Sequence, residues 1–232
     1  MNLHELKQHF PAAPEYLTQI LLIERDYNTV SNARLADRLG VTRPAVSQAV
    51  GRLKKLGLVD QDRYGAIGLS AEGRLIAENV LRRHFLLEHL LVGILGYPWA
   101  KSDEEAMKLQ DSLSDDLTEH LSERLGHPQT CPHGNPMPGS PLEKRYLNAP
   151  SLIEAAESSE VSILRITEEG EMVEGLLSFC QEYGLGPGTV LKIVSRGSEE
   201  VLCSLGGSEV SLPVQFARNI MWAPSQAAVG AE

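Results

Sequence analysis

The segment from residue 31 to residue 70 constrains the fold of this chain more than any other. It carries the start and stop signals of two short helices joined by a tight turn. Ser31 is a residue type that caps helix N-termini, and Gly40 takes the left-handed conformation at a helix end without steric cost. Thr42 then provides a second cap, with Pro44 in the first turn, where its missing N–H costs nothing. This is the layout of helix-turn-helix DNA readers.

The residues after the second helix predict a β-hairpin between Leu58 and Leu69, with its turn near Tyr64 and Gly65. The module is therefore a winged helix-turn-helix. A helical pair used only for packing is the alternative, but the caps, the polar face and the wing all favour a DNA reader. Polar residues at the start of the second helix suit base edges, and the basic residues suit phosphates. The predicted DNA-binding residues are Arg34, Thr42, Arg43, Pro44, Ser47, Gln48, Arg52, Lys55 and Arg63.

The distribution of charge supports a DNA reader on an acidic body. The 232-residue chain has a net charge of −10. Residues 31–65 carry seven Lys or Arg against three acidic residues, which leaves the remainder strongly acidic. No apolar run reaches the ~18 residues that span a bilayer, and no secretory signal is visible. Three widely spaced cysteines favour a reducing compartment, so we expect a cytoplasmic protein without membrane contact.

The middle of the chain predicts helices. One begins at Pro14 or the residue before it, and a long helix from Ala71 to about Leu95 leaves the reader. A further helix is predicted from Asp103 to about Leu125, with Ser102 as its N-terminal cap. The helix at Pro14 would be the first helix of the reader, and the later helices would form a second domain.

The last third changes to a β-type pattern. From Val161 onward, short apolar or alternating segments are separated by glycine turns, and one helix from about Glu171 to Tyr183 interrupts them. The pattern predicts a small, partly open barrel, and a frayed tail from Ala223 onward. The expected fold class is α+β, with a winged helix-turn-helix at residues 1–73, a helical domain at 74–149 and a β-barrel domain at 150–223.

The sequence does not predict an enzyme, because no nucleophilic triad, phosphate loop or dinucleotide fingerprint is present. The glycines at 184, 186 and 188 lack a strand-turn-helix context and are interpreted as a turn. Cys131 and His133 are two residues apart and could ligate a metal. A lone pair falls short of the four ligands of a structural zinc site, so we interpret this stretch as a tight loop.

His84 and Glu88 are the better metal candidates. At i and i+4 they share one face of the long helix, although this spacing alone also fits a solvated pair. The acidic helix that follows repeats potential ligands at three- and four-residue intervals, so a second ligand face could meet the first. A histidine with several oxygen ligands suits a borderline-to-hard divalent ion such as Fe²⁺ or Mn²⁺.

Together these motifs resemble the diphtheria-toxin-repressor family of metal-dependent transcriptional regulators, over nearly the whole chain. The helix that follows Thr42 resembles the family's recognition helix, and the helix with His84 and Glu88 resembles its metal-ligating helix. The family combines this reader with a helical dimerisation domain and an SH3-like β-barrel. The other matching motifs are Ser114-Asp115, Cys131-Pro132-His133-Gly134-Asn135-Pro136-Met137-Pro138-Gly139, Gly184-Leu185-Gly186-Pro187-Gly188 and Arg218-Asn219-Ile220.

The resemblance implies two metal sites. An ancillary site would use His84 and Glu88, with Asp103 in place of the family's usual histidine, and Glu171 or Glu174 from the SH3-like domain. A primary site would join the reader to the dimerisation domain, but its ligands are altered in this chain. The residues at the primary-site positions are Glu15, Met107, Gln110 and Asp111. All but Gln110 offer plausible ligands.

The implied function is a cytoplasmic homodimeric regulator, a repressor, that binds palindromic operator DNA when loaded with Fe²⁺ or Mn²⁺. The apolar positions expected at its two-fold interface include Leu87, Leu91, Leu109, Leu113 and Leu117. Two alternatives remain: a DNA-binding regulator whose degenerate metal site answers another signal, and a cytosolic adaptor for a metal transporter that works through its SH3-like domain. The basic reader face argues against the adaptor, which has no use for it.

Overall fold

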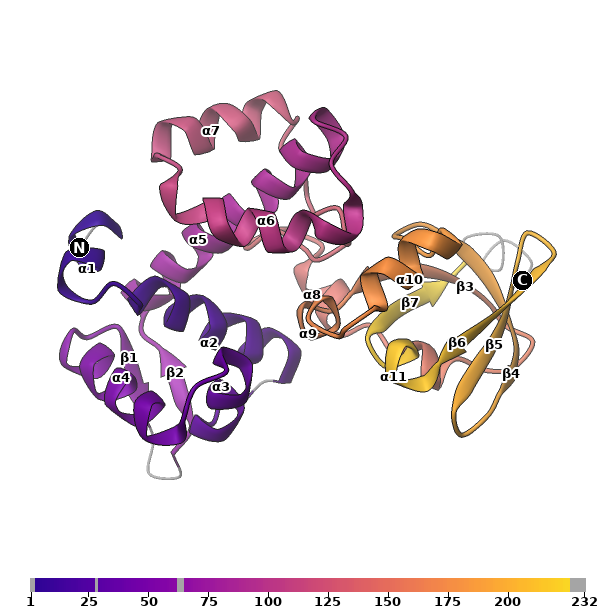
Figure 1. Ribbon diagram of the computed structural model, residues 1–232, viewed down its shortest axis with the longest axis horizontal. Coiled ribbons are helices and arrows are strands. Elements are labelled where there is room, and N and C mark those ends of the chain that lie inside the picture. Colours follow the sequence, from indigo (N-terminus) through magenta and orange to yellow (C-terminus); the bar gives the residue numbers. More distant parts are fainter. Residues whose placement is uncertain (1–2, 28, 62–64, 226–232) are drawn as a thin grey trace. The chain divides into compact units, whose positions relative to one another are not determined.

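The computed structural model describes residues 3–27, 29–61 and 65–225, and it divides into two compact units, residues 1–83 and 84–232 (Figure 1). The first unit contains the predicted winged helix-turn-helix. The second holds the helical region and the β region together. The predicted boundary between these two regions, at residues 149 and 150, stays a prediction.

Four helices and a hairpin form the first unit: α1 (Leu3–His9), α2 (Ala13–Tyr27), α3 (Asn32–Leu39), α4 (Arg43–Lys55), β1 (Val59–Gln61) and β2 (Ile67–Leu69). β1 and β2 pair antiparallel. Both predicted caps are present, since the side chains of Ser31 and Thr42 accept hydrogen bonds from the N–H groups of Arg34 and Ala45. Gly40 has a φ of 64°, as its role as a helix stop requires. The two helices and the wing predicted from the sequence are therefore observed.

Residues 3–9 form a helix that the sequence did not predict. α1 is only seven residues long, too short to be stable alone, but it buries Leu6 completely. Phe10, which follows it, is also buried and lies beside Tyr16 of α2 with the ring centroids 6.1 Å apart. Tertiary packing therefore holds α1 in place. Arg63, which was predicted to bind DNA, and Tyr64 of the predicted turn lie outside the described residues.

α5 (Ala71–His89) is the predicted long helix, and its last turn widens into a π-helix over Leu90–Ile94 before Gly96 ends it with a φ of 64°. A short 3₁₀ turn (Trp99–Lys101) leads into α6 (Ser102–Leu109). Ser102 is not a cap but the first helical residue, and its hydroxyl donates to the carbonyl of Trp99.

The single helix predicted from 103 to 125 is wrong. A 3₁₀ turn (Gln110–Ser112) follows α6, and Leu113 is extended. Ser114 then caps a separate helix, α7 (Asp115–Arg124), by accepting a hydrogen bond from the N–H of Leu117. Of the apolar positions expected at a two-fold interface, Leu87 and Leu91 pack with Ala106 in a small core, whereas Leu109 and Leu117 are exposed. The interface stays a prediction. The short helix α8 (Glu143–Leu147) follows.

The β region is one antiparallel five-stranded sheet in the order β6-β5-β4-β3-β7. No described residue pairs the edge strands β6 and β7, so the sheet does not close into a barrel. β7 includes Ala223, which had been expected in a frayed tail. The strands are β3 (Glu160–Ile166), β4 (Val190–Arg196), β5 (Glu200–Leu205), β6 (Ser208–Pro213) and β7 (Ile220–Pro224).

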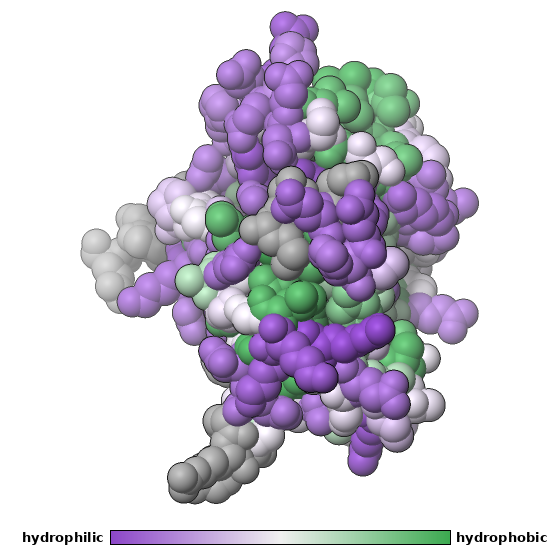
Figure 2. Space-filling model, turned by 90° about the vertical axis from the view of Figure 1, so that its left-hand side faces the viewer, coloured by the Kyte–Doolittle hydropathy of each residue, from purple (hydrophilic) through white to green (hydrophobic). Residues whose placement is uncertain are grey.

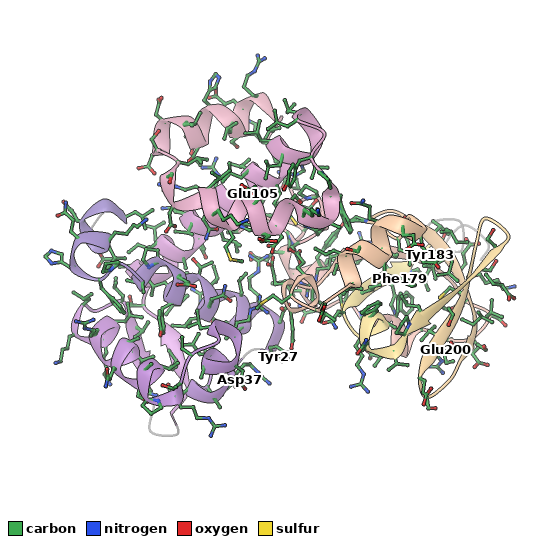
Figure 3. All side chains as sticks on the ribbon, viewed as in Figure 1. Tyr27, Asp37, Glu105, Phe179, Tyr183 and Glu200 are labelled. Atoms are coloured by element: carbon green, nitrogen blue, oxygen red, sulfur yellow. The ribbon has the colours of Figure 1, made fainter. Side chains whose placement is uncertain are left out.

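The helix predicted from 171 to 183 is two helices, α9 (Glu168–Glu171) and α10 (Leu176–Tyr183), because Gly175 has a φ of 84° and interrupts them. α10 packs on the core of the sheet, and the ring centroids of Phe179 and Tyr183 lie 4.6 Å apart on it (Figure 3). Phe179 also contacts the buried Phe216 of α11 (Val214–Ala217). A 3₁₀ turn (Leu152–Glu154) covers the same core.

A β-bulge in β3 decides which side chains of that strand face the core. The pairing with β7 shifts between Ile163 and Arg165, so that Leu164 is an extra residue. Ile163 and Ile166 both join the core of the sheet, whereas Leu164 and Arg165 are buried outside it. The bulge therefore aims Arg165 away from the core.

Hydrophilic side chains cover much of the face in Figure 2, and hydrophobic side chains reach it in separate areas. Within the second unit the most exposed large hydrophobic residues are Ile94 and Leu95, 66% and 65% exposed, followed by Met172 at 52% and Leu117 at 46%. None of the described helices is both long and apolar enough to cross a membrane.

Candidate metal centre and nucleic-acid interface

Glu88 lies at the centre of a buried cluster of metal-ligating side chains in the second unit. Its side chain is 0% exposed and one helical turn from His84 on α5. The Nε2 atom of His84 lies 3.1 Å from Oδ1 of Asp103 on α6 and 3.7 Å from Oε1 of Glu88. The structure therefore brings together the three residues that the sequence suggested for an ancillary metal site.

The loop after α7 brings two further ligand types to the same carboxylate. Nδ1 of the fully buried His133 lies 2.9 Å from Oε1 of Glu88. The donor atoms of Glu88, Cys131 and His133 all lie within 4.8 Å of one another, as do those of His84, Glu88 and Asp103. Glu88 thus belongs to two overlapping sets of donors. The tight loop predicted for Cys131 and His133 is present, but its side chains also face the centre.

Each imidazole has one nitrogen held by an acceptor outside the cluster. Nδ1 of His84 lies 3.0 Å from Oε1 of Gln110, and Nε2 of His133 lies 3.1 Å from the carbonyl oxygen of Trp99. Both acceptors need an N–H, so the other nitrogen of each ring is left facing the carboxylates. Such outer acceptors commonly fix the tautomer and orientation of metal-ligating histidines.

The start of the β region completes the centre with carboxylates from α9. Oε1 of Glu171 lies 3.6 Å from Nδ1 of His133, and Glu168 is buried beside it. Glu174, the alternative that the sequence offered, is exposed between α9 and α10. The sequence did not identify Glu168, and only its place one helical turn before Glu171 could have suggested it.

The carboxylates keep His84 protonated in the metal-free protein. Burial alone lowers the pKa of His84, but the hydrogen bond to Asp103 and the charges of the nearby carboxylates raise it to about 9. Burial alone would raise the pKa of Asp103, but the hydrogen bond to His84 holds the pKa of that carboxyl below its usual value. An imidazolium therefore balances part of the negative charge near neutral pH.

Other groups in the centre are pushed towards their neutral forms. Burial and the charges of neighbouring carboxylates raise the pKa of Glu171 well above its usual value. Burial, followed by the charge of Glu88, raises the pKa of the Cys131 thiol in the same direction. A metal ion bound here would have to displace protons from several ligands.

The residues present fit a divalent cation. Both carboxylate oxygens of Glu88, Nδ1 of His133 and Oε2 of Glu171 are buried, and they make no hydrogen bond with any of the described residues. Nδ1 of His133 and Oε1 of Glu88 are among these atoms although they lie 2.9 Å apart, because their contact does not have the geometry of a hydrogen bond. Buried carboxylates without donors are costly, and a bound cation relieves that cost. Imidazole, carboxylate and thiol donors together suit a transition metal.

The loop that carries Cys131 and His133 lies directly on β3. The N–H of Ile166 donates to the carbonyl of His133 at 2.9 Å. A Cβ on Gly134, which has a φ of 93°, would lie 2.2 Å from the carbonyl oxygen of Leu164. Only glycine fits this approach.

Of the residues predicted for a primary site, only Gln110 is seen, within the second unit and among the described residues, in contact with one of these donors. Met107 is exposed on α6, Asp111 is half-buried, and Gln110 makes its contact with His84. Glu15 belongs to the first unit, where it is exposed on α2. The primary site stays a prediction.

The first unit presents a polar face along α4. Its apolar side chains, Val46, Val50 and Leu53, are buried. Ser47 accepts a hydrogen bond from Asn32 of α3 at 3.2 Å. The predicted DNA-binding residues Thr42, Arg43, Pro44, Ser47, Gln48, Arg52 and Lys55 are all exposed.

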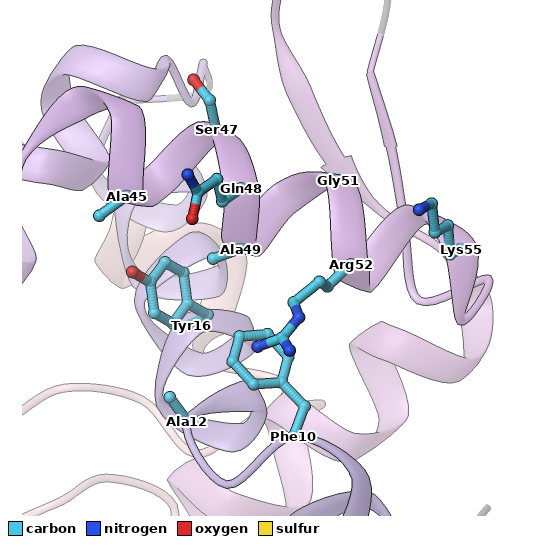
Figure 4. Close-up of a pocket in the computed structure, with 10 residues that line it drawn as sticks. All are labelled: Phe10, Ala12, Tyr16, Ala45, Ser47, Gln48, Ala49, Gly51, Arg52 and Lys55. Atoms are coloured by element: carbon cyan, nitrogen blue, oxygen red, sulfur yellow. The ribbon is translucent and has the colours of Figure 1, made fainter.

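A pocket of about 590 Å³ opens on this face, between α4 and the turn from α1 to α2 (Figure 4). Gln48, Arg52 and Lys55 line one side of it, and Phe10 and Tyr16 line the other. The guanidinium of Arg52 lies over the ring of Phe10, 5.2 Å from its centroid.

Arg34 is exposed on α3, and its guanidinium stacks on the ring of Tyr27, 3.7 Å from the centroid. Figure 3 shows Tyr27 at the end of α2. The stacking restrains the guanidinium of Arg34.

Two family descriptions match the chain. Residues 10–67 match the N-terminal DNA-binding domain of iron-dependent repressors, and residues 70–139 match the metal-binding and dimerisation domain of the same repressors.

Curated relatives and solved structures extend the similarity into the β region. The iron-dependent repressor IdeR of Mycobacterium leprae is 30% identical over 215 residues, which cover 88% of this chain and 94% of the relative. The diphtheria toxin repressor of Corynebacterium jeikeium is 31% identical over 78% of this chain and 83% of its own length. A manganese-dependent transcriptional repressor in complex with manganese superposes with a TM-score of 0.79, at 29% identity over 92% of this chain and 99% of that chain.

Proposed function

This chain belongs to the family of iron-dependent repressors, which are metal-dependent transcriptional repressors and not enzymes, and we propose that its regulatory ion is bound at the centre around Glu88. The observation that carries the proposal is a pair of histidines that are oriented by hydrogen bonds to acceptors outside the cluster. His84 and His133 each use one nitrogen on an outer acceptor and turn the other towards the same buried carboxylate. The proposed ion is Fe²⁺ or Mn²⁺, and the proposed place of action is the cytoplasm.

The proposed regulation is a linkage between metal and DNA. A bound divalent ion supplies the positive charge that the carboxylates of Glu88, Glu171 and Asp103 need. These residues then hold α5, α6 and α9 in one arrangement. His84 and Glu88 lie on α5, whose first part belongs to the DNA-binding unit. Restraining that helix favours one spacing of the two readers in a dimer, and half-sites one helical turn or a multiple apart would fit that spacing.

We propose that the dimer forms through the exposed apolar residues of the helical region. Ile94, Leu95 and Leu117 are exposed in this unit, whereas Leu87 and Leu91 pack within their own chain. A two-fold interface presents the same patch from both copies, which suits such a surface.

Gln48→Ala tests the reading of bases. Gln48 is exposed on α4 and can pair with adenine through two hydrogen bonds. We expect its loss to cost about 1–3 kcal/mol at a specific operator and little on random DNA. Lys55→Ala is the matched comparison, because a phosphate contact should weaken both DNAs about equally and lower the salt dependence. Fluorescence titration of both duplexes measures these effects, and equal losses for Gln48→Ala on both would rule out base reading.

Cys131→Ser tests which donors the centre prefers. A thiolate favours softer ions, so its loss should weaken Zn²⁺ and Co²⁺ more than Mn²⁺. We expect wild-type protein to bind Zn²⁺ more tightly than Mn²⁺, following the Irving–Williams order, and the variant to narrow that gap. Competition titrations give the affinities, and the near-ultraviolet absorption of the Co²⁺ form reports a thiolate ligand. Cys203→Ser is the control, since Cys203 is buried in the sheet core. An unchanged Zn²⁺ preference would exclude Cys131 from the ligands of the centre.

Selection of DNA by the loaded protein tests the proposed function. We expect Mn²⁺-loaded protein to enrich palindromic sites from random duplexes, and the same protein in chelator to enrich none. Equal enrichment with and without metal would leave a DNA-binding protein that answers another signal.

A further inference from the structure

A continuous chain of hydrogen bonds runs from Arg165 on β3 through Asn135 to Glu171 of the metal centre. The guanidinium of Arg165 donates from Nη1 to Oδ1 of Asn135 at 2.9 Å. Nδ2 of Asn135 then donates to Oε1 of Glu171 at 2.6 Å and to the carbonyl of Ile166 at 2.8 Å. Asn135 is 0% exposed and Arg165 only 2%.

The direction of this chain is fixed by chemistry. A guanidinium can only donate, so the amide of Asn135 must turn its oxygen to Arg165. The amide nitrogen then necessarily faces Glu171 and the carbonyl of Ile166. Were the amide reversed, its oxygen would face a carboxylate and a carbonyl while its N–H₂ group faced a cation. Arg165 therefore sets the orientation of Asn135, and Asn135 presents a donor to Glu171.

The local backbone is shaped for this arrangement. The bulge at Leu164 turns Arg165 out of the sheet core, where an unbroken alternation would have placed it. Nε of Arg165 also donates to the carbonyl of Tyr146, 3.1 Å away, which anchors the guanidinium. Gly134 lets the loop lie close enough for Asn135 to reach β3.

We propose that Asn135 and Arg165 are positioning residues of the metal centre, which act through Glu171. The bond from Asn135 occupies Oε1 of Glu171, and Oε2, which accepts no hydrogen bond from the described residues, stays available to a cation. The carboxylate is thereby held in one rotamer before the ion arrives. This inference rests on the proposed function, because it assigns a role to residues around the same site. Metal-site partners of this kind commonly contribute 10–100-fold in metal affinity.

A double-mutant cycle on metal affinity tests the inference. The variants are Asn135→Ala, Glu171→Ala and the double variant, and Mn²⁺ and Co²⁺ titrations give their affinities. We expect Asn135→Ala to weaken binding by about 10–100-fold in the wild-type background. In the Glu171→Ala background the same substitution should change affinity by less than about threefold, because the group through which Asn135 acts is gone. Asn148→Ala is the control, since Asn148 is exposed and its side chain donates locally, to the carbonyl of Lys144.

Stability is separated from positioning by comparing each protein with and without metal. Asn135→Ala should lower the melting temperature of the metal-free protein, and it should also shrink the further rise that Mn²⁺ produces. If Asn135→Ala does not fold, Arg165→Lys replaces it. Lysine keeps the charge but lacks the planar fork, so the same pattern should appear with a smaller factor.

Three results would overturn the inference. Equal losses from Asn135→Ala in both backgrounds would mean a structural role only. An affinity unchanged by Asn135→Ala while wild-type protein binds Mn²⁺ would remove the positioning role and leave the proposed function intact. Failure of wild-type protein itself to bind either ion would overturn the proposed function and this inference with it.

Discussion

Glu88→Gln should remove most of the metal response of this protein. Glu88 is the one carboxylate shared by both donor sets, and glutamine keeps its shape while losing its charge. Outer partners of metal sites contribute up to about 100-fold in affinity, so the loss of this ligand should cost at least as much. At a metal concentration 100 times the wild-type Kd, the stabilisation by metal should fall from about 2.7 to about 0.4 kcal/mol or less. Thermal or denaturant unfolding with and without Mn²⁺ measures it.

Glu104→Gln is the matched control for this substitution. Glu104 lies next to Asp103 on α6, but its side chain is 78% exposed and forms an ion pair with Lys108. Such surface pairs contribute little, so metal affinity and the stabilisation by Mn²⁺ should remain as in wild type. If Glu88→Gln responds to Mn²⁺ as Glu104→Gln does, the ion binds elsewhere and the centre described here is not the regulatory site.

Metal affinity should rise steeply with pH up to about 9. The carboxylates around His84 raise its pKa to about 9 in the metal-free protein, so near neutral pH a metal ion must displace its proton. That proton alone makes affinity increase about tenfold per pH unit, and its contribution to the slope should disappear above the pKa. An unperturbed histidine would instead give a window near 6.5. Mn²⁺ or Co²⁺ titrations across this range measure the slope, and His120→Gln, at an exposed position on α7, is the control.

The stability of the metal-free protein should move in the opposite direction. Because the folded-state pKa of His84 lies above its unfolded value of about 6.5, its contribution is complete below that value. The contribution is lost as pH rises through about 9. The raised pKa values of His133 and Glu171 also make the metal-free protein less stable as pH rises.

A metal affinity that levels off already near pH 7 would contradict the assignment of His84 as a ligand that is protonated in the metal-free protein.

The reader could be predicted from the sequence because its signals are local. Ser31, Gly40 and Thr42 act within one turn of their own helices, and a winged helix-turn-helix needs little else to be recognised. The break at Ser114 is equally local, since serine is a common cap. The apolar pattern continues across Ser114, however, and its helical periodicity predicts one helix where the structure has two.

The metal centre was predicted only as far as helical spacing reaches. His84 and Glu88 follow from i and i+4, but the approach of His133 depends on a loop about forty residues further along the chain. A Cys-x-His pair alone does not predict that it will contact Glu88. The bulge in β3 decides where Arg165 points, and no local sequence pattern predicts it. Long-range packing supplied what local patterns could not.

The coupling between metal and DNA is the central claim, and reciprocity tests it most directly. DNA affinity is measured with Mn²⁺ and with chelator, and Mn²⁺ affinity is measured with and without the selected operator. We expect metal to tighten DNA binding at least fivefold and DNA to tighten metal binding by the same factor, as linkage requires. Glu88→Gln should abolish both effects together. Equal DNA affinity in chelator and in saturating Mn²⁺ would contradict the account.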